Sequence, residues 1–133
     1  MPWNVTPTPV EIELLMEAGY IYRDAGRYHE ARDVFRGVRA LAPASETPEV
    51  ALGTVAFQQS DFRAAAKHYA RALDMNPRCA LAHAHLGELR LFEKDKDGAR
   101  EHLKKAVELD PRGPVRPLAD SLLTMVEVVA FKP

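Results

Sequence analysis

The chain has 133 residues and a formal net charge of −1, which suggests a single domain without a strongly charged surface. It lacks the basic patch of nucleic-acid-binding proteins and the polybasic run that attracts anionic membranes, so we expect neither partner. A single cysteine, Cys79, excludes an internal disulfide and fits a reducing compartment. With no secretory signal and no apolar stretch of membrane-spanning length, the sequence predicts a cytoplasmic protein.

The first residues are too few and too rich in proline to fold alone, so residues 1–8 are predicted to form a flexible tail that carries Trp3. The following Thr8-Pro9-Val10-Glu11 combines a capping box with proline at the first helical position. A helix therefore begins here, and residues 9–133 are expected to form one domain.

A repeat organises most of the chain. The segments ALAP, DMNP and ELDP end in Pro43, Pro77 and Pro111, which are spaced by 34 residues each time. Proline cannot supply the amide that would continue a helix, so each one marks a helix end. The pattern divides the chain into repeats 12–45, 46–79 and 80–113.

Small residues also recur at this spacing. Gly19, Gly53 and Gly87 share one repeat position, inside the first predicted helix of each unit. Glycine inside a helix costs roughly 1 kcal/mol relative to alanine, so its threefold use implies a close contact between backbones. The second helices carry alanine at a shared position, and these residues are the expected partners of the glycines: Ala31, Ala65 and Ala99.

This register resembles the tetratricopeptide repeat, and GRYHEA at Gly26–Ala31 is close to the middle signature of that repeat. The resemblance covers residues 12–113. It implies an all-α fold in which three helical hairpins stack as a right-handed solenoid, with a C-terminal capping helix. Together these elements give seven helices and no sheet.

The capping helix is predicted over residues 117–129, because stacked repeats expose an apolar edge unless a terminal element covers it. Leu118, Leu122, Met125 and Val129 lie on one face of this helix. Three further apolar residues exceed what a cap needs, and they predict self-association as a homodimer: Leu123, Val126 and Val128. The alternative is a cap folded deeply against the third repeat.

No catalytic motif is present, so we expect neither an enzyme nor a cofactor. His83 and His85 lie two residues apart and should point to different faces of a helix, whereas His68 and His102 share a repeat position and would stack. A metal site needs more converging ligands, so the histidines are predicted to be solvated, with no metal site. Cys79 is expected to be a small residue in a turn between repeats.

In tetratricopeptide proteins the first helices line a concave groove that is available to a peptide. By repeat position, this resemblance implies a binding groove of Glu13, Met16, Tyr20, Arg23, Val50, Thr54, Phe57, Leu81, His85, Glu88 and Phe92. The core is predicted to use other positions: Leu15, Ala18, Tyr22, Leu52, Ala56 and Leu86. The additional apolar residues then form an exposed patch typical of an interaction site, although ordinary packing is the alternative.

Two uses of this fold can be compared with the groove. Co-chaperones that hold a C-terminal carboxylate need cationic side chains where this chain has Met16, Tyr20, Leu81 and His85, so a carboxylate clamp is not expected. The chain is more similar to class II, or translocator, chaperones of bacterial type III secretion. The matching stretches are AGRYHEARDVF at 25–35, ALGTVAFQQSDFRAAAKHYARAL at 51–73 and SLLTMVEVVAF at 121–131.

This resemblance implies a groove that holds an extended, proline-containing segment of a secreted translocator. The sequence thus favours a protein-interaction module or chaperone that binds an extended peptide of a protein partner. The alternative is a structural scaffold or assembly subunit that associates through its C-terminal helix.

Overall fold

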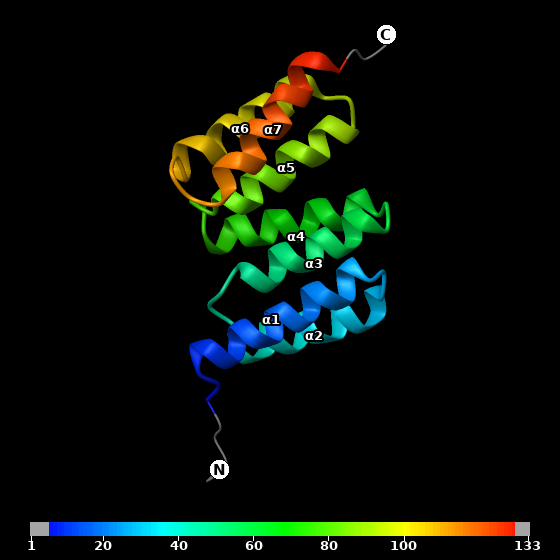
Figure 1. Ribbon diagram of the computed structural model, residues 1–133, viewed down its shortest axis with the longest axis vertical. Coiled ribbons are helices and arrows are strands. Elements are labelled where there is room, and N and C mark those ends of the chain that lie inside the picture. Colours follow the sequence, from blue (N-terminus) through cyan, green and yellow to red (C-terminus); the bar gives the residue numbers. More distant parts are fainter. Residues whose placement is uncertain (1–5, 130–133) are drawn as a thin grey trace.

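The structure, a computed structural model, describes residues 6–129. These residues form seven α-helices and no strand (Figure 1). The helices are α1 (Pro9–Asp24), α2 (Tyr28–Leu41), α3 (Thr47–Gln58), α4 (Phe62–Met75), α5 (Ala80–Phe92), α6 (Lys96–Leu109) and α7 (Val115–Val128). The predicted tail, with Trp3, falls largely outside the described residues, as does the C-terminal end with Phe131. The domain limits therefore stay a prediction.

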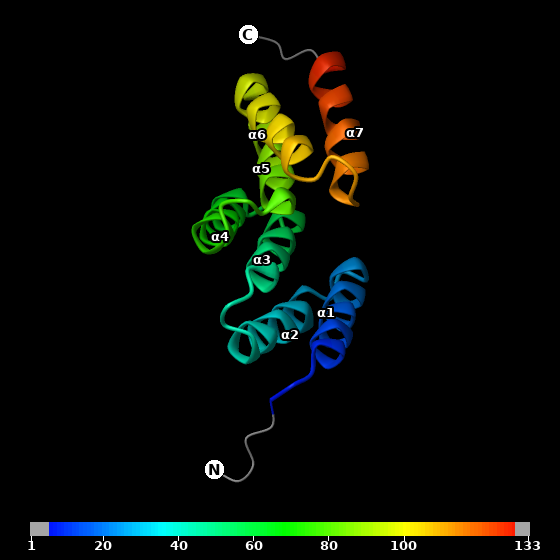
Figure 2. The ribbon, with the colours of Figure 1, turned by 90° about the vertical axis from the view of Figure 1, so that its left-hand side faces the viewer.

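Consecutive helices pair as hairpins, α1 with α2, α3 with α4 and α5 with α6, and the hairpins follow one another along the long axis of the molecule (Figures 1 and 2). The last helix, α7, contacts both α5 and α6. The predicted seven-helix, all-α architecture is confirmed. Within residues 6–129, no helix is both long and apolar enough to cross a membrane.

Local sequence signals set the helix starts. Thr8 Oγ1 accepts a hydrogen bond from the Glu11 amide, and a Glu11 carboxylate oxygen accepts one from the Thr8 amide, both at 3.1 Å. This is the predicted capping box. Asp61 caps α4 because its side chain accepts a hydrogen bond from the Ala64 amide.

The glycines of the first helices make close contacts, but mainly with larger side chains than the predicted alanines. A Cβ atom added to Gly19 would overlap the ring of Phe35, and one added to Gly53 would overlap the ring of Tyr69. At Gly87 it would overlap the side chain of Leu103. The glycines therefore make room mainly for large side chains one helical turn beyond the predicted alanines. The predicted alanine contact is present at Gly87, where the Ala99 carbonyl oxygen would lie 3.2 Å from the added Cβ.

The core forms three clusters, each enclosed where consecutive helices meet. Leu52, Ala56 and Leu86 are buried as predicted. Leu15 is 38% exposed, which corrects its assignment to the core. It lies on α1, where it borders a hollow shared with Leu14 and Leu41.

The capping helix differs from the prediction in its limits and in its buried face. It begins at Val115, two residues before Pro117, and proline is tolerated in the first turn of a helix. Its buried side chains are Ala119, Leu122 and Val126. Met125 is 42% exposed and so does not belong to the buried stripe.

Candidate functional site

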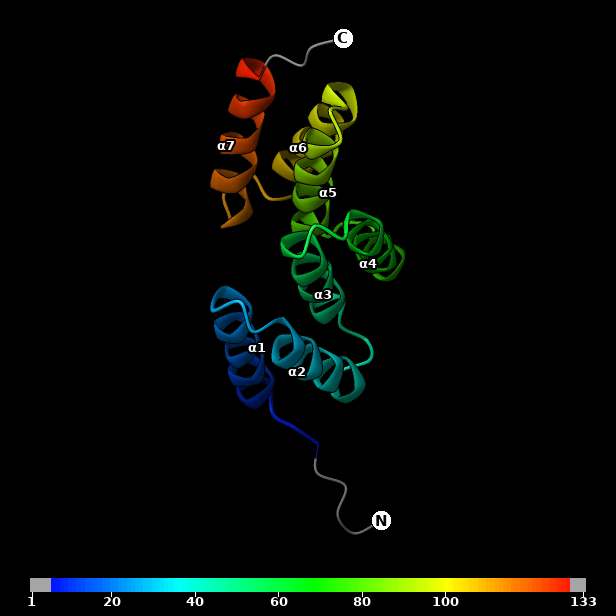
Figure 3. The same cartoon turned by 90° about the vertical axis from the view of Figure 1, so that its right-hand side faces the viewer.

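The first helices of the three hairpins share one side of the molecule. α3 contacts both α1 and α5. In Figure 3, α1 and α7 lie on the same side of α3 and α5, whereas α4 lies on the other. We call the surface formed by the predicted groove residues on these three helices the α1–α3–α5 face.

Three predicted groove residues are buried and belong to the core instead. Met16, Val50 and Thr54 are only 6%, 2% and 7% exposed. Met16 packs in the cluster with Phe35, and Val50 in the cluster with Tyr69. For these three residues the alternative interpretation, ordinary packing, was the better one. The rest of the predicted set retains accessible surface: Glu13, Tyr20, Arg23, Phe57, Leu81, His85, Glu88 and Phe92.

A polar link joins α1 to α3 on this face. The Arg23 guanidinium donates a hydrogen bond to Thr54 Oγ1 at 2.9 Å and lies 5.0 Å from the centre of the Tyr20 ring. The Thr54 hydroxyl donates in turn to the carbonyl of Ala51 at 2.7 Å. Burial raises the pKa of Tyr20, so its hydroxyl stays protonated near neutral pH. The link fixes a guanidinium and a phenol side by side.

A second polar group lies on α5. The His85 ring stacks on that of Tyr69, with centroids 5.6 Å apart, and His85 Nδ1 is 3.4 Å from a Glu88 carboxylate oxygen. The Tyr69 hydroxyl is fully buried and has no hydrogen-bond partner among residues 6–129. Burial, followed by the negative charge of Glu88, raises the pKa of this phenol. The face therefore has a buried hydroxyl beneath charged groups.

Three phenylalanine rings gather where α3, α4 and α5 approach one another. Phe57 lies 5.3 Å from Phe62 and 5.0 Å from Phe92, between ring centroids, and Phe62 lies 5.9 Å from Phe92. Phe92 is 57% exposed. Phe62 was missed from the sequence, although its position just after the α4 N-cap placed it close to the end of α3. This aromatic cluster can receive an apolar or aromatic side chain.

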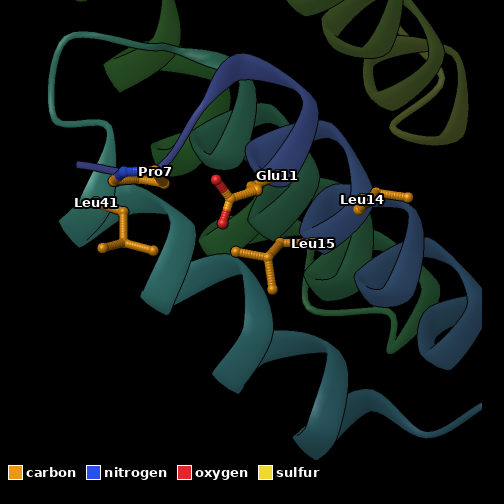
Figure 4. Close-up of a pocket in the computed structure, with 5 residues that line it drawn as sticks. All are labelled: Pro7, Glu11, Leu14, Leu15 and Leu41. Atoms are coloured by element: carbon orange, nitrogen blue, oxygen red, sulfur yellow. The ribbon is translucent and has the colours of Figure 1, made fainter. Parts of the chain in front are cut away.

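Two hollows adjoin α1. One, of about 330 Å³, brings together Glu13, Met16 and Tyr20 from the predicted set with Thr47 and Pro48 at the start of α3. The other was not predicted. It has a volume of about 490 Å³ and lies between α1 and α2, and Figure 4 shows the residues that line it: Pro7, Glu11, Leu14, Leu15 and Leu41.

The predicted self-association surface is only partly accessible. Val126 is completely buried against the third hairpin, so it cannot join a dimer contact while α7 stays docked. Leu123 is half-buried, and Val128 is 73% exposed. The deeply folded cap, which was the alternative, describes Val126 correctly. A homodimer through α7 stays a prediction that rests on Val128 and the edge of Leu123.

The histidines on the second helices do not stack on each other, which corrects another prediction. His68 Nδ1 lies 2.8 Å from a Glu49 carboxylate oxygen, whereas His102 Nδ1 lies 3.3 Å from His83 Nδ1. His83 and His85 do face different neighbours, as predicted. Cys79 is buried at the start of α5, and burial raises the pKa of its thiol, as expected for a packing residue.

Sequence profiles of the tetratricopeptide repeat match residues 12–44 and 50–114. No curated protein matches the sequence significantly. Among solved structures, the chain is similar to the Yersinia enterocolitica type III secretion chaperone SycD in complex with a peptide of the translocator YopD. The identity is 19%, the TM-score is 0.72, and the match covers 91% of this chain and 95% of that one.

Two other similar structures have comparable scores. PcrH from Pseudomonas aeruginosa is 20% identical with a TM-score of 0.75, over 96% of this chain and all of that one (100%). The first repeat domain of Spaghetti (RPAP3), bound to the HSP90 peptide SRMEEVD, is 19% identical with a TM-score of 0.72, over 93% and 96% of the two chains. At these identities the likeness shows the shared fold, an all-α solenoid of helical hairpins.

Proposed function

The chain belongs to the tetratricopeptide repeat family, and from this premise we propose that it binds an extended segment of a protein partner on its α1–α3–α5 face. The observation that carries the proposal is the aromatic cluster of Phe57, Phe62 and Phe92. An aromatic side chain as exposed as Phe92, resting on two other rings, offers an anchor for an apolar side chain of a ligand.

The polar groups on the same face give the bound segment an orientation. Arg23 on α1 and Glu88 on α5 are half-buried and opposite in charge. Side chains already held by neighbours, as Arg23 is by Thr54, lose little further freedom when they bind a ligand. A peptide would therefore place an apolar residue against the aromatic cluster and its polar groups near Arg23 and Glu88.

The more specific proposal is a chaperone for a secreted translocator. Its support is the fold shared with SycD and with PcrH, whose structure has also been solved in complex with the chaperone binding region of PopD. The partner segment would be extended and apolar, and would contain proline, which preorganises an extended chain.

The test is a selection from a library of random linear peptides, displayed on phage, against the purified chain. We expect it to enrich peptides with apolar or aromatic residues at a fixed spacing. Because Phe92 is mostly exposed, Phe92→Glu should weaken the selected peptides at least about tenfold while the far-ultraviolet circular dichroism stays unchanged.

The matched control is Met75→Glu, which changes a side chain of similar exposure, 43%, at the end of α4. Met75→Glu should leave peptide affinity intact. If both variants bind equally well, or if no peptide is enriched, the α1–α3–α5 face is not the binding site.

A further inference from the structure

Two histidines from paired helices meet in the third hairpin. His83 lies on α5 and His102 on α6, and their Nδ1 atoms are 3.3 Å apart. Their ring centroids are 5.5 Å apart. Because His85 faces Tyr69 while His83 faces His102, this pair lies on a different side of α5 from the proposed peptide site.

The backbone determines which nitrogen of His83 carries its proton. His83 Nε2 is 3.3 Å from the carbonyl oxygen of Pro77, which can only accept a hydrogen bond. Nε2–H is therefore the donor, and the Nδ1 lone pair of neutral His83 points toward His102. A backbone carbonyl on the far ring nitrogen is the usual way in which proteins orient a histidine that ligates a metal.

The separation of the two Nδ1 atoms fits such a role. Zinc–imidazole bonds of 2.0–2.1 Å at tetrahedral angles place two ligand nitrogens about 3.3–3.4 Å apart. The observed distance is 3.3 Å. It is longer than a typical N–H···N hydrogen bond, so direct proton sharing would be weak.

The surroundings leave room for the remaining ligands. A hollow of about 490 Å³ is bordered by both histidines and by two acidic and two basic side chains, Glu101, Lys104, Lys105 and Glu108. Lys105 is 3.6 Å from Glu108, so this pair adds little net charge beside the rings. Among residues 6–129 no group of three or more His, Cys, Asp and Glu converges, so the protein supplies two ligands and water completes the coordination.

Both imidazoles are neutral near neutral pH. Burial lowers the pKa of His83, assisted by the charge of Lys105, and burial followed by the charge of His83 lowers the pKa of His102. Neutral rings are the form that binds metal, so protons compete only at acidic pH.

We propose that His83 and His102 form a binding site for a borderline-soft divalent transition metal ion such as Zn²⁺ or Ni²⁺, which cross-links α5 to α6. Imidazole nitrogen suits these ions, whereas Mg²⁺ prefers oxygen ligands. Because the ion binds both helices only when they are paired, it stabilises the folded third hairpin.

The experiment is calorimetric titration of the chelator-treated full chain with Zn²⁺, and separately with Mg²⁺. We expect one Zn²⁺ per chain, no binding of Mg²⁺, and a rise in Tm with Zn²⁺. His83→Gln and His102→Gln keep a side chain of similar polarity, and each should reduce Zn²⁺ affinity at least about tenfold and abolish the Tm rise.

His29→Gln is the matched control, because His29 is a largely exposed histidine on α2, remote in sequence from the pair. It should bind Zn²⁺ like the wild type. NMR resonances of the His83 and His102 rings should shift on titration, which locates the ion even if a variant unfolds. The proposal fails if wild type shows no binding up to about millimolar Zn²⁺, or if His29→Gln loses as much affinity as the other variants.

Discussion

The second and third hairpins carry different chemistry at the same two repeat positions. Residues 49 and 83 are 34 apart, and so are residues 68 and 102. In the second hairpin these positions hold a carboxylate and an imidazole in hydrogen-bond contact, Glu49 with His68, and in the third they hold two imidazoles, His83 with His102. The repeat thus brings the same two positions together in both hairpins but leaves the chemistry of their side chains free to vary.

The preceding hairpin accounts for part of this difference. Arg39 of α2 reaches Glu49 at 3.2 Å, and the equivalent position before His83 is Leu73. Burial raises the pKa of Glu49, but hydrogen bonds from His68 and Arg39 outweigh it, so the pKa lies below its ordinary value. The buried Glu49 carboxylate thus has two hydrogen-bonding partners, and Leu73 could not supply the equivalent of Arg39 in the third hairpin.

The largest expected effect concerns a feature that the two hairpins share, namely the close contact of Gly53 with Tyr69 and of Gly87 with Leu103. Gly53→Leu should lower the free energy of unfolding by about 3 kcal/mol, the upper end for overpacking, because the rigid Tyr69 ring fills the space. Gly87→Leu should cost somewhat less, since the Leu103 side chain can change rotamer. Urea denaturation monitored by circular dichroism measures both values.

Gly37 supplies the control for these substitutions. It lies inside α2, and no atom comes within 4 Å of a Cβ added there. Gly37→Ala should therefore raise stability by up to about 1 kcal/mol through helix propensity alone. An unchanged urea midpoint in Gly53→Leu would show that the two helices are not in close contact.

The next effect tests the contact between Glu49 and His68. Glu49→Ala removes a buried carboxylate and leaves His68 and Arg39 without it, so we expect a loss of about 2 kcal/mol. His83→Ala at the equivalent position, in metal-free protein, should cost less than about 1 kcal/mol, because the pair there is neutral and its contact is long.

A double-mutant cycle on Glu49 and His68 isolates the pair from other effects of truncation. A coupling energy near zero would mean that Arg39 alone stabilises the carboxylate. If Glu49→Ala and His83→Ala lowered the free energy of unfolding equally, the two positions would contribute alike to the stability of their hairpins.

The architecture could be predicted from the sequence, but the burial of individual side chains could not. Prolines at a fixed spacing and the capping box gave the hairpins, because both act within a few residues. Met16 and Tyr20 lie one turn apart on the same helix, yet only Met16 is fully covered. Burial at this face depends on how closely the next hairpin approaches. The sequence pattern of a single helix gives no information about that distance.

The capping helix illustrates the same point. Its apolar residues form two overlapping stripes at helical spacing, one through Leu118 and Met125 and one through Ala119 and Val126. The structure buries Ala119 and Val126 together with Leu122, the one fully buried residue of the predicted stripe. A pattern that counts only large apolar residues therefore finds Leu122 but overlooks Ala119.

A smaller effect is the pH dependence of the unfolding free energy, which also differs between the two hairpins. The pKa values of His83 and His102 are lower in the folded chain than in the unfolded chain. Their contribution to stability is therefore present above the unfolded value of about 6.5 and is lost as the pH falls through the folded values. Metal-free wild type should be less stable at pH 5.5 than at pH 7.5.

The stabilising contribution of Glu49 is lost in a lower pH range than that of the two histidines. Because the folded pKa of Glu49 is depressed, its contribution is complete above the unfolded value and is lost only below it, as the pH falls through the folded value. The double variant His83→Gln/His102→Gln should therefore reduce the change in unfolding free energy between pH 7.5 and 5.5. A change identical to that of wild type would assign the pH dependence to other groups.

The smallest effect lies in the turns that join the two helices of each hairpin. Gly26, Ser60 and Lys94 occupy one repeat position, and all three have positive φ angles, of 77°, 60° and 64°. A non-glycine residue with such a φ angle costs roughly 1–2 kcal/mol, and part of that is offset because glycine makes the unfolded chain more flexible.

Ser60→Gly and Lys94→Gly should each raise the free energy of unfolding by about 0.5 kcal/mol, and Gly26→Ala should lower it by about 1 kcal/mol. Urea midpoints of the three variants provide the measurement. If Lys94→Gly destabilises while Ser60→Gly stabilises, the Lys94 side chain contributes contacts that exceed its backbone strain, and the two turns differ in chemistry as their hairpins do.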